Sequence, residues 1–276
     1  MAASTGAHMR TLLSVVVAVT AALMLPQDSS KSTSLVANLA PTVVVRGPVP
    51  FGVGEKTEYR ARYGALNVGT GAMEVKGIGS LRGRPTWNVE LRVSAKVPVL
   101  YSVTGTFSSW MDTSSLYSLQ YVSDQVENRN KRLRFFEIYP EKSTYRQRIT
   151  PDTLREVPSV PDPLDETSFL FFIRTIPLVV GETYTFPRYF RPDRNPVVIR
   201  VIGKDTVSVP AGSFPAIVIQ PTIKTPSGLF AQDAETRVWI SDDPSKMILK
   251  VVSKTALFAL QLDMTNYTPA KLPPGR

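Results

Sequence analysis

The densest group of side chains that could carry out chemistry in this sequence is a set of four carboxylates near the middle of the chain. They are Asp162, Asp165, Glu166 and Glu182. Two carboxylates that face each other across a cleft would suit hydrolysis of a glycosidic bond. The first three precede an apolar run, however, where acidic side chains cap and stabilise the start of a helix. We therefore interpret them as helix caps and predict no catalytic residue.

The composition excludes several other classes of chemistry. The chain has no cysteine, which rules out disulfides, zinc–thiolate sites, iron–sulfur clusters and thiol catalysis. Its one histidine, His8, precedes an apolar N-terminal run. The rest of the chain therefore has no imidazole for a Ser-His-Asp triad or for a histidine metal site. We predict a protein that is not an enzyme and that has no metal site and no cofactor.

Two short motifs indicate turns, each with a rarer alternative. Pro210 to Gly212 suits a tight reversal between two strands, or else an anion-binding nest of backbone amides. Asp242 to Pro244 suits a hairpin turn in which the aspartates cap their own backbone. Calcium binding at the second motif would need more oxygen ligands at alternate positions than the surrounding residues supply.

An uncharged apolar run from Thr11 to Leu25 follows Arg10 and ends at Pro26. A basic flank and an apolar stretch of this length are typical of a secretion signal. As a helix, the run would span about 24 Å, less than the ~30 Å hydrocarbon core of a bilayer. Its small residues are followed by further apolar ones, a poor context for cleavage, so we expect a short retained anchor. The expected anchor residues are Leu12, Leu13, Val16, Val19 and Leu23.

The chain divides into four parts by composition. They are an export signal or signal anchor (1–26), an extended proline-rich linker (27–50), a β domain (51–268) and a tail (269–276). The linker contains the extended apolar segment Val43, Val44 and Val45. Such a segment can lie along a partner or add to a sheet edge, so these valines are candidate partner-binding residues.

Apolar and polar residues alternate along much of the β domain. Tyr59 and Ala61 are separated by charged residues, and so are Val89 and Leu91, the pattern of strands with one buried and one wet face. Further strands are expected at residues 69–75, 101–107, 116–122, 133–139, 144–149, 182–186, 197–202, 216–219, 237–240, 248–254 and 257–267. Their spacing and the intervening turn residues predict an antiparallel meander.

One stretch breaks the alternation. Asp162 can cap a helix, Pro163 suits its first position, and Pro177 would end it. The residues between are apolar almost all round, including Phe169 and Phe172. A short helix of this kind must be buried, so we expect it to pack against a concave sheet.

Four stretches resemble a family of exported bacterial proteins classed as a domain of unknown function. They are FGVGEKTEYRARYGALNVGTGAMEV, DETSFLFFIRTIPLVVGETYTF, VSVPAGSFPAIVI and RVWISDDPSKMILKVV. The most specific are V-x-V-P-A-G-x-F from Val207 to Phe214 and the W-I-S-D-D that begins at Trp239. A departure is that Phe169 and Phe172 stand where the family leads us to expect a tyrosine and small residues.

The resemblance implies a secreted or periplasmic β protein of partly open barrel type, similar to periplasmic lipoprotein carriers, and it implies no activity. The overall make-up also resembles an accessory periplasmic subunit of a bacterial photosynthetic reaction-centre and light-harvesting complex. The expected fold is mainly β, an antiparallel meander that forms a partly open barrel or curved sheet on one short apolar helix, preceded by an N-terminal apolar helix.

The net charge of +9 favours an acidic partner or anionic lipid over nucleic acid, which an exported chain rarely meets. Arginine beside aromatic residues is typical of protein interfaces. The second set of partner-binding candidates is therefore Arg188, Tyr189, Phe190, Arg191 and Arg194. Another basic stretch, which includes Arg132 and Arg134, alternates with apolar residues and is interpreted as the wet face of a strand.

Two functions remain open, beside the simpler alternative of a free periplasmic protein whose leader is cleaved. The first is a non-enzymatic protein, tethered to the inner membrane in the periplasm, that stabilises a large membrane complex. The second is a periplasmic carrier that holds a lipid or other hydrophobic ligand in a half-barrel. A carrier must keep an apolar cavity open, whereas a scaffold would fill its interior with Phe169, Phe172 and their neighbours.

Overall fold

A computed structural model describes residues 48–97, 101–150, 153–225, 230–254 and 259–271. Fourteen strands form one antiparallel sheet in this part of the chain. Their order in the sheet is β8-β7-β6-β5-β4-β3-β2-β1-β14-β13-β12-β11-β10-β9. Strands that follow one another in the chain are therefore neighbours almost throughout, and β1 joins the two halves by pairing with β14. The predicted antiparallel meander is confirmed, and the sheet is not closed into a barrel.

Most of the strands extend further than their alternation indicated, whereas β13 has the predicted bounds and β9 is one residue shorter. Their bounds are β1 Lys56–Tyr63, β2 Leu66–Leu81, β3 Arg84–Val97, β4 Tyr101–Asp112, β5 Ser118–Glu127, β6 Asn130–Tyr139, β7 Thr144–Thr150, β8 Thr153–Pro158, β9 Thr183–Phe186, β10 Val197–Val209, β11 Gly212–Ile223, β12 Glu235–Ser241, β13 Ile248–Lys254 and β14 Ala259–Thr268. The sequence did not predict β8. This edge strand is mostly exposed, so it has no buried face to produce an alternating pattern.

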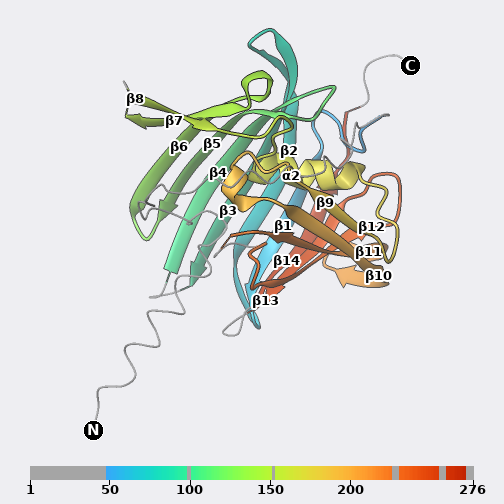
Figure 1. The fold of residues 1–276 in the computed structure, drawn as a ribbon. Coiled ribbons are helices and arrows are strands. Elements are labelled where there is room, and N and C mark those ends of the chain that lie inside the picture. Colours follow the sequence, from blue (N-terminus) through green and yellow to red (C-terminus); the bar gives the residue numbers. More distant parts are fainter. Residues whose placement is uncertain (1–47, 98–100, 151–152, 226–229, 255–258, 272–276) are drawn as a thin grey trace.

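The sheet curls around one short helix, α2 (Glu166–Phe172), with β5 to β8 on one side of it and β10 to β12 on the other (Figure 1). The helix contacts β3 and β4, and its residues from Thr167 to Phe172 are buried. This arrangement confirms a buried helix on a concave sheet. A 3-10 turn, Ile173–Thr175, continues the helix before Pro177.

The helix begins three residues later than the sequence indicated. Asp165 is its N-cap, and the carboxylate of Asp165 accepts hydrogen bonds from the backbone amides of Thr167 and Ser168, both at 2.8 Å. The backbone amide of Asp165 in turn donates to Ser168 Oγ, which completes a capping box. The expected cap, Asp162, is wrong because Leu164 pairs as a β-bridge with Tyr189 and cannot be helical at the same time.

A buried ion pair fastens the far end of the helix to the start of the sheet. Arg174 Nη1 donates to Glu55 Oε1 at 2.6 Å, and both side chains are almost fully buried. Arg174 Nη2 also donates to the carbonyl oxygens of Pro50 and Ser245. Removing one partner of such a pair would leave an uncompensated buried charge, so the pair holds these segments in fixed positions.

Both motifs interpreted as turns are turns in the structure. Val209 and Gly212 are paired at the β10–β11 hairpin, and Gly212 has a φ of 138°, which favours glycine. Asp243 Oδ1 accepts hydrogen bonds from the backbone amides of Ser245 and Lys246 between β12 and β13. Each motif therefore has a structural role in a hairpin.

Candidate ligand-binding site

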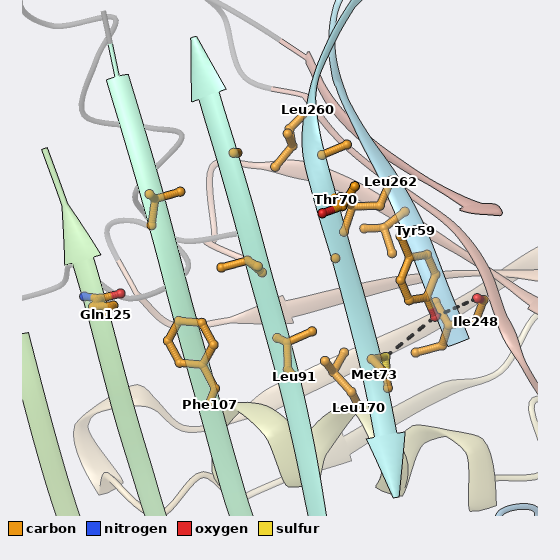
Figure 2. A pocket seen from close by; sticks show the side chains of 16 residues that line it. Tyr59, Thr70, Met73, Leu91, Phe107, Gln125, Leu170, Ile248, Leu260 and Leu262 are labelled. Carbon is orange, nitrogen blue, oxygen red and sulfur yellow. Dashed lines mark hydrogen bonds between the residues drawn. The ribbon is translucent and has the colours of Figure 1, made fainter. Parts of the chain in front are cut away.

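The concave face of the sheet contains an apolar cavity of about 110 Å³ beside α2 (Figure 2). Its walls come from consecutive strands of the sheet, from β5 through β1 to β13, and from the helix. The lining residues are Tyr59, Ala61, Thr70, Gly71, Met73, Leu91, Val93, Ala95, Val103, Phe107, Gln125, Leu170, Ile248, Val251, Leu260 and Leu262. Most are aliphatic or aromatic, so the cavity suits hydrocarbon.

Small residues on three neighbouring strands leave this space open. They are Ala61 on β1, Gly71 on β2 and Ala95 on β3. A Cβ atom at Gly71 would lie 3.5 Å from the carbonyl oxygen of Arg92 and 3.9 Å from Tyr59 Cβ. These are ordinary contact distances, so the space in front of Gly71 would accept a side chain.

The one phenol in the cavity wall is already satisfied by the protein. Tyr59 Oη donates to the carbonyl oxygen of Ile248 at 2.9 Å and lies 3.7 Å from Met73 Sδ (Figure 2). Burial raises the pKa of Tyr59, and the positive charge of Arg174 offsets only part of that increase. Tyr59 therefore stays neutral and presents its ring to the cavity.

The helix that closes the cavity is held by a buried carboxylate. Asp165 also accepts a hydrogen bond of 2.5 Å from Ser109 Oγ on β4 and another from Ser118 Oγ on β5. Burial raises the pKa of Asp165 to about 6, against the opposing effect of these hydrogen bonds. The arrangement fixes the start of α2 on the sheet and directs Leu170 into the cavity.

The segment predicted to dock onto a partner is partly inside the molecule. Arg188, Tyr189 and Phe190 are all at least 96% buried, so these three candidate partner-binding side chains do not form an exposed surface in this structure. The backbone amide of Leu164 donates to the carbonyl oxygen of Arg188, and the backbone amide of Phe190 donates to the carbonyl oxygen of Leu164. The ring of Phe190 packs edge-on against Phe136, with 5.3 Å between centroids. The segment covers the sheet.

Arg188 packs its charge against the helix. Its Nε donates to the carbonyl oxygen of Asp162 at 2.9 Å, and its guanidinium lies 4.5 Å from the ring centroid of Phe172. Burial lowers the pKa of Arg188, because removal from water disfavours the charged form. The role of Arg188 in this structure is internal.

The other two arginines of that segment line a small polar pocket. Arg191 and Arg194 are half-buried and lie near Glu166 and Arg134. The interpretation of Arg134 as a wet-face residue is wrong, because Arg134 points to the same side of β6 as the buried Phe136. A partner contact at Arg191 or Arg194 stays a prediction.

The four carboxylates singled out in the sequence have separate surroundings. Asp165 binds the serines of β4 and β5, Glu166 faces the polar pocket, and Glu182 is exposed. Burial and the neighbouring carboxylate of Asp162 raise the pKa of Tyr117. Within the described residues, no three histidine, cysteine, aspartate or glutamate side chains gather where they would hold a metal ion.

The remaining candidates lie outside the described residues. They are the anchor residues Leu12, Leu13, Val16, Val19 and Leu23, and the linker valines Val43, Val44 and Val45. The predicted N-terminal helix and the division of the chain before residue 48 stay predictions. None of the helices in the described ranges is both long enough and apolar enough to span a bilayer.

The sequence indicated the inward faces of the strands but not the cavity. Tyr59, Ala61 and Leu91 were expected on the buried face, and all three line the cavity. The signal that was missed is the combination of small residues at inward positions of adjacent strands. Gly71 in particular lies opposite Tyr59 in the ladder, a pairing that only the register reveals.

The chain belongs to DUF3108, a family of proteins of unknown function, whose model matches residues 58–265. The structure is similar to a β-barrel-like protein of the domain of unknown function DUF1849 from Brucella abortus, with a TM-score of 0.54 and 7% identity. That similarity covers 80% of this chain and 100% of the other, and it supports the fold. No curated protein matches the sequence.

Two further solved structures show weaker similarity. One is an inferred lipoprotein from Parabacteroides distasonis, with a TM-score of 0.31, 8% identity and coverage of 80% and 98% of the two chains. The other is an inferred exported protein with a YmcC-like fold from Bacteroides fragilis, with a TM-score of 0.29, 11% identity and the same coverage.

Proposed function

We propose that this member of the DUF3108 family is a non-enzymatic binding protein of the bacterial envelope, which holds the hydrocarbon part of a lipid or other hydrophobic ligand. The observation that carries the proposal is the apolar cavity of about 110 Å³ on the concave face of the sheet. A pure scaffold would fill that face with its own side chains, as Phe169 and Phe172 fill the region around α2.

Keeping such a space open has an energetic cost. The walls of an unfilled cavity lose van der Waals contacts, and the loss is about 24 cal/mol per Å³ of cavity. For a cavity of about 110 Å³ this amounts to roughly 2–3 kcal/mol. Hydrocarbon in the cavity would recover part of this free energy, which gives the site a driving force for binding.

The size of the cavity limits what can enter it. An apolar cavity of ~150 Å³ accepts benzene, whereas a site that encloses a drug-sized ligand measures ~300–1,000 Å³. The cavity therefore suits a short length of one hydrocarbon chain. The rest of a longer ligand would lie along the concave face, which is possible because the sheet is open.

The proposed location is the periplasm, with attachment to the inner membrane through residues 11–25. This rests on the apolar run and its basic flank in the sequence. The role of an accessory subunit in a photosynthetic reaction-centre and light-harvesting complex rests on the resemblance of the sequence alone. It stays a prediction, and the experiment below tests it together with the carrier function.

Native mass spectrometry of the full-length protein, extracted gently from its own cells, tests the proposal. We expect an adduct with the mass of a lipid or other hydrophobic molecule at a fixed stoichiometry, and its loss after extraction with organic solvent and refolding. Co-migration with a large membrane complex, without any small adduct, would contradict the carrier function and support the accessory-subunit prediction.

A further inference from the structure

A small polar pocket lies beside the apolar cavity on the same face of the sheet. Its volume is about 20 Å³, and its lining residues are Tyr121, Ser123, Arg134, Phe136, Glu166, Phe190, Arg191 and Arg194. They come from β5, from β6, from the start of α2 and from the segment that follows β9. A space of ~10–15 Å³ holds one water molecule, so this pocket holds one or two oxygen atoms.

Two elements contribute a residue to each of the two pockets. On β5, Gln125 lines the apolar cavity and Ser123, two residues earlier on the same face, lines the polar pocket. On α2, Leu170 lines the cavity and Glu166, about one helical turn away, lines the polar pocket. Figure 2 shows Gln125 at the margin of the cavity.

The register of the sheet gives the spacing between the two sites. Ser123 pairs with Phe107 of the cavity wall on one side and with Arg134 on the other. Neighbouring strands are ~4.8 Å apart, so Phe107 and Arg134 are separated by about 10 Å across the sheet. One extended amphiphile can reach both sites.

The polar pocket carries an excess of positive charge. Its lining contains three guanidinium groups, those of Arg134, Arg191 and Arg194, and one carboxylate, that of Glu166. Glu166 Oε1 also accepts a hydrogen bond of 2.5 Å from Tyr189 Oη. Arg191 has a partner at the rim, since its Nη2 lies 3.6 Å from the exposed carboxylate of Asp193. Burial lowers the pKa of Arg134, a shift that a bound anion would oppose.

Three buried polar atoms at the pocket have no hydrogen-bond partner among the described residues. They are Ser123 Oγ, Arg191 Nε and Glu166 Oε2. Ser123 is only 2% exposed, so bulk water does not satisfy its hydroxyl. Buried polar groups are nearly always paired, and unpaired ones point to a bound water or ligand. The Ser123 hydroxyl and the Arg191 Nε–H are donors that an anionic oxygen would accept from, whereas Glu166 Oε2 is an acceptor that a bound water would satisfy.

We propose that the ligand of the apolar cavity is a single-chain amphiphile whose anionic head group binds at Arg134, Arg191, Arg194 and Ser123. This inference rests on the proposed function, because the hydrocarbon chain lies in the cavity. The shared chemistry of the head group is an anionic oxygen, from either a carboxylate or a phosphate. A space for one or two oxygen atoms suits the terminal oxygens of both.

The test compares alkyl ligands that differ only in their head group on the wild-type protein. Dodecanoate, dodecyl phosphate and dodecyltrimethylammonium, each below its micelle concentration, and dodecanol below its solubility limit compete with the uncharged fluorescent dye N-phenylnaphthylamine. We expect the two anions to displace the dye at concentrations about tenfold or more below that of dodecanol, since hydrogen bonds to charged groups are the stronger ones. The better of the two anions identifies the source as a carboxylate or a phosphate.

A pair of variants locates the head group. Arg134→Gln should lower the preference for anions over dodecanol to near one, and it should leave dye binding unchanged. Lys131→Gln removes the same charge from β6 but lies on the opposite face of the strand, so it should keep the full preference.

The possible failures are distinguishable. Equal displacement by dodecanoate and dodecanol would contradict the proposal of an anionic head group but not that of a hydrophobic ligand. The polar pocket would then hold water. Failure of the dye and of every alkyl ligand to bind would overturn the proposed function itself. If Arg134→Gln does not fold by circular dichroism, the wild-type series alone decides.

Discussion

The concave face of this sheet has two regions that are built in opposite ways. Over β5 to β7, large rings fill the space: Phe190 packs on Tyr121, Phe136 and Tyr145, with 5.1 to 6.5 Å between centroids. Over β1 to β3, the inward positions hold Ala61, Gly71 and Ala95, and a cavity remains. Both regions lie on one sheet, and they differ in two ways: small inward residues leave room in the second, and the segment after β9 places the ring of Phe190 on the first.

This difference in packing assigns stability to the filled region and ligand binding to the open region. The filled region holds the segment after β9 and the start of α2 in place, whereas the open region gives up contacts that a ligand could supply. Substitutions in the first should change the free energy of unfolding, and substitutions in the second should change ligand binding. The predictions below test that division, from the largest expected effect to the smallest.

Phe190→Ala should destabilise the protein by about 3–5 kcal/mol, because it removes a ring that is 99% buried among three others. Urea unfolding followed by circular dichroism measures the change. A loss below about 1 kcal/mol would show that the segment after β9 is not part of the core, and the distinction between a filled and an open region would fail.

Stability should depend on pH through Asp165 in the filled region. Its pKa is about 6 in the folded protein against an ordinary value of 3.8 for an aspartate, so folding favours the protonated form. The stability that this group contributes is therefore complete below pH 3.8 and is lost as pH rises through about 6, a change on the order of 3 kcal/mol.

Asp165→Asn isolates this effect, since an amide can still accept the capping hydrogen bonds but does not titrate. The difference in unfolding free energy between wild type and variant should shift between pH 4 and pH 7 in the variant's favour. Parallel profiles over that range would contradict the assigned pKa and its cause. Urea titrations at intervals of half a pH unit are sufficient.

Leu91→Ala in the open region should cost less than Phe190→Ala, about 1–2 kcal/mol. Leu91 faces the cavity and is only partly buried, so fewer packed contacts are lost than in a closed core. The same urea experiment measures it. A loss as large as that of Phe190→Ala would show that the two regions are packed alike.

The sequence predicted the architecture well and the site poorly, for a physical reason. Alternation indicated the inward faces of β1 and β3, and the apolar run around Phe169 indicated a buried helix. Whether an inward position is filled depends on residues far apart in the chain, such as Gly71 opposite Tyr59. The burial of Phe190 likewise depends on the bridge between Leu164 and Tyr189, which no local pattern encodes.

The polar pocket was hidden by the same limitation. Arg134 alternates with apolar neighbours, and alternation alone does not say which face of β6 is wet. The pairing of Arg134 with Ser123 places it on the concave face. The segment with Arg191 and Arg194 returns over that face and adds positive charge to the pocket, and Glu166 of α2 supplies the opposite charge in its lining.

The most direct measurement of the central claim is a titration of N-phenylnaphthylamine into wild type, Gly71→Leu and Gly77→Leu. Gly71→Leu places an isobutyl group in the cavity, whereas a Cβ atom at Gly77 on the same strand meets nothing within 4 Å, and Gly77 does not line the cavity. Neither glycine has a positive φ, so both variants should fold, with stability unchanged or raised by about 0.5–1 kcal/mol. We predict equal binding by wild type and Gly77→Leu, and binding about tenfold or more weaker by Gly71→Leu. Equal binding by all three proteins would contradict a ligand site in the cavity.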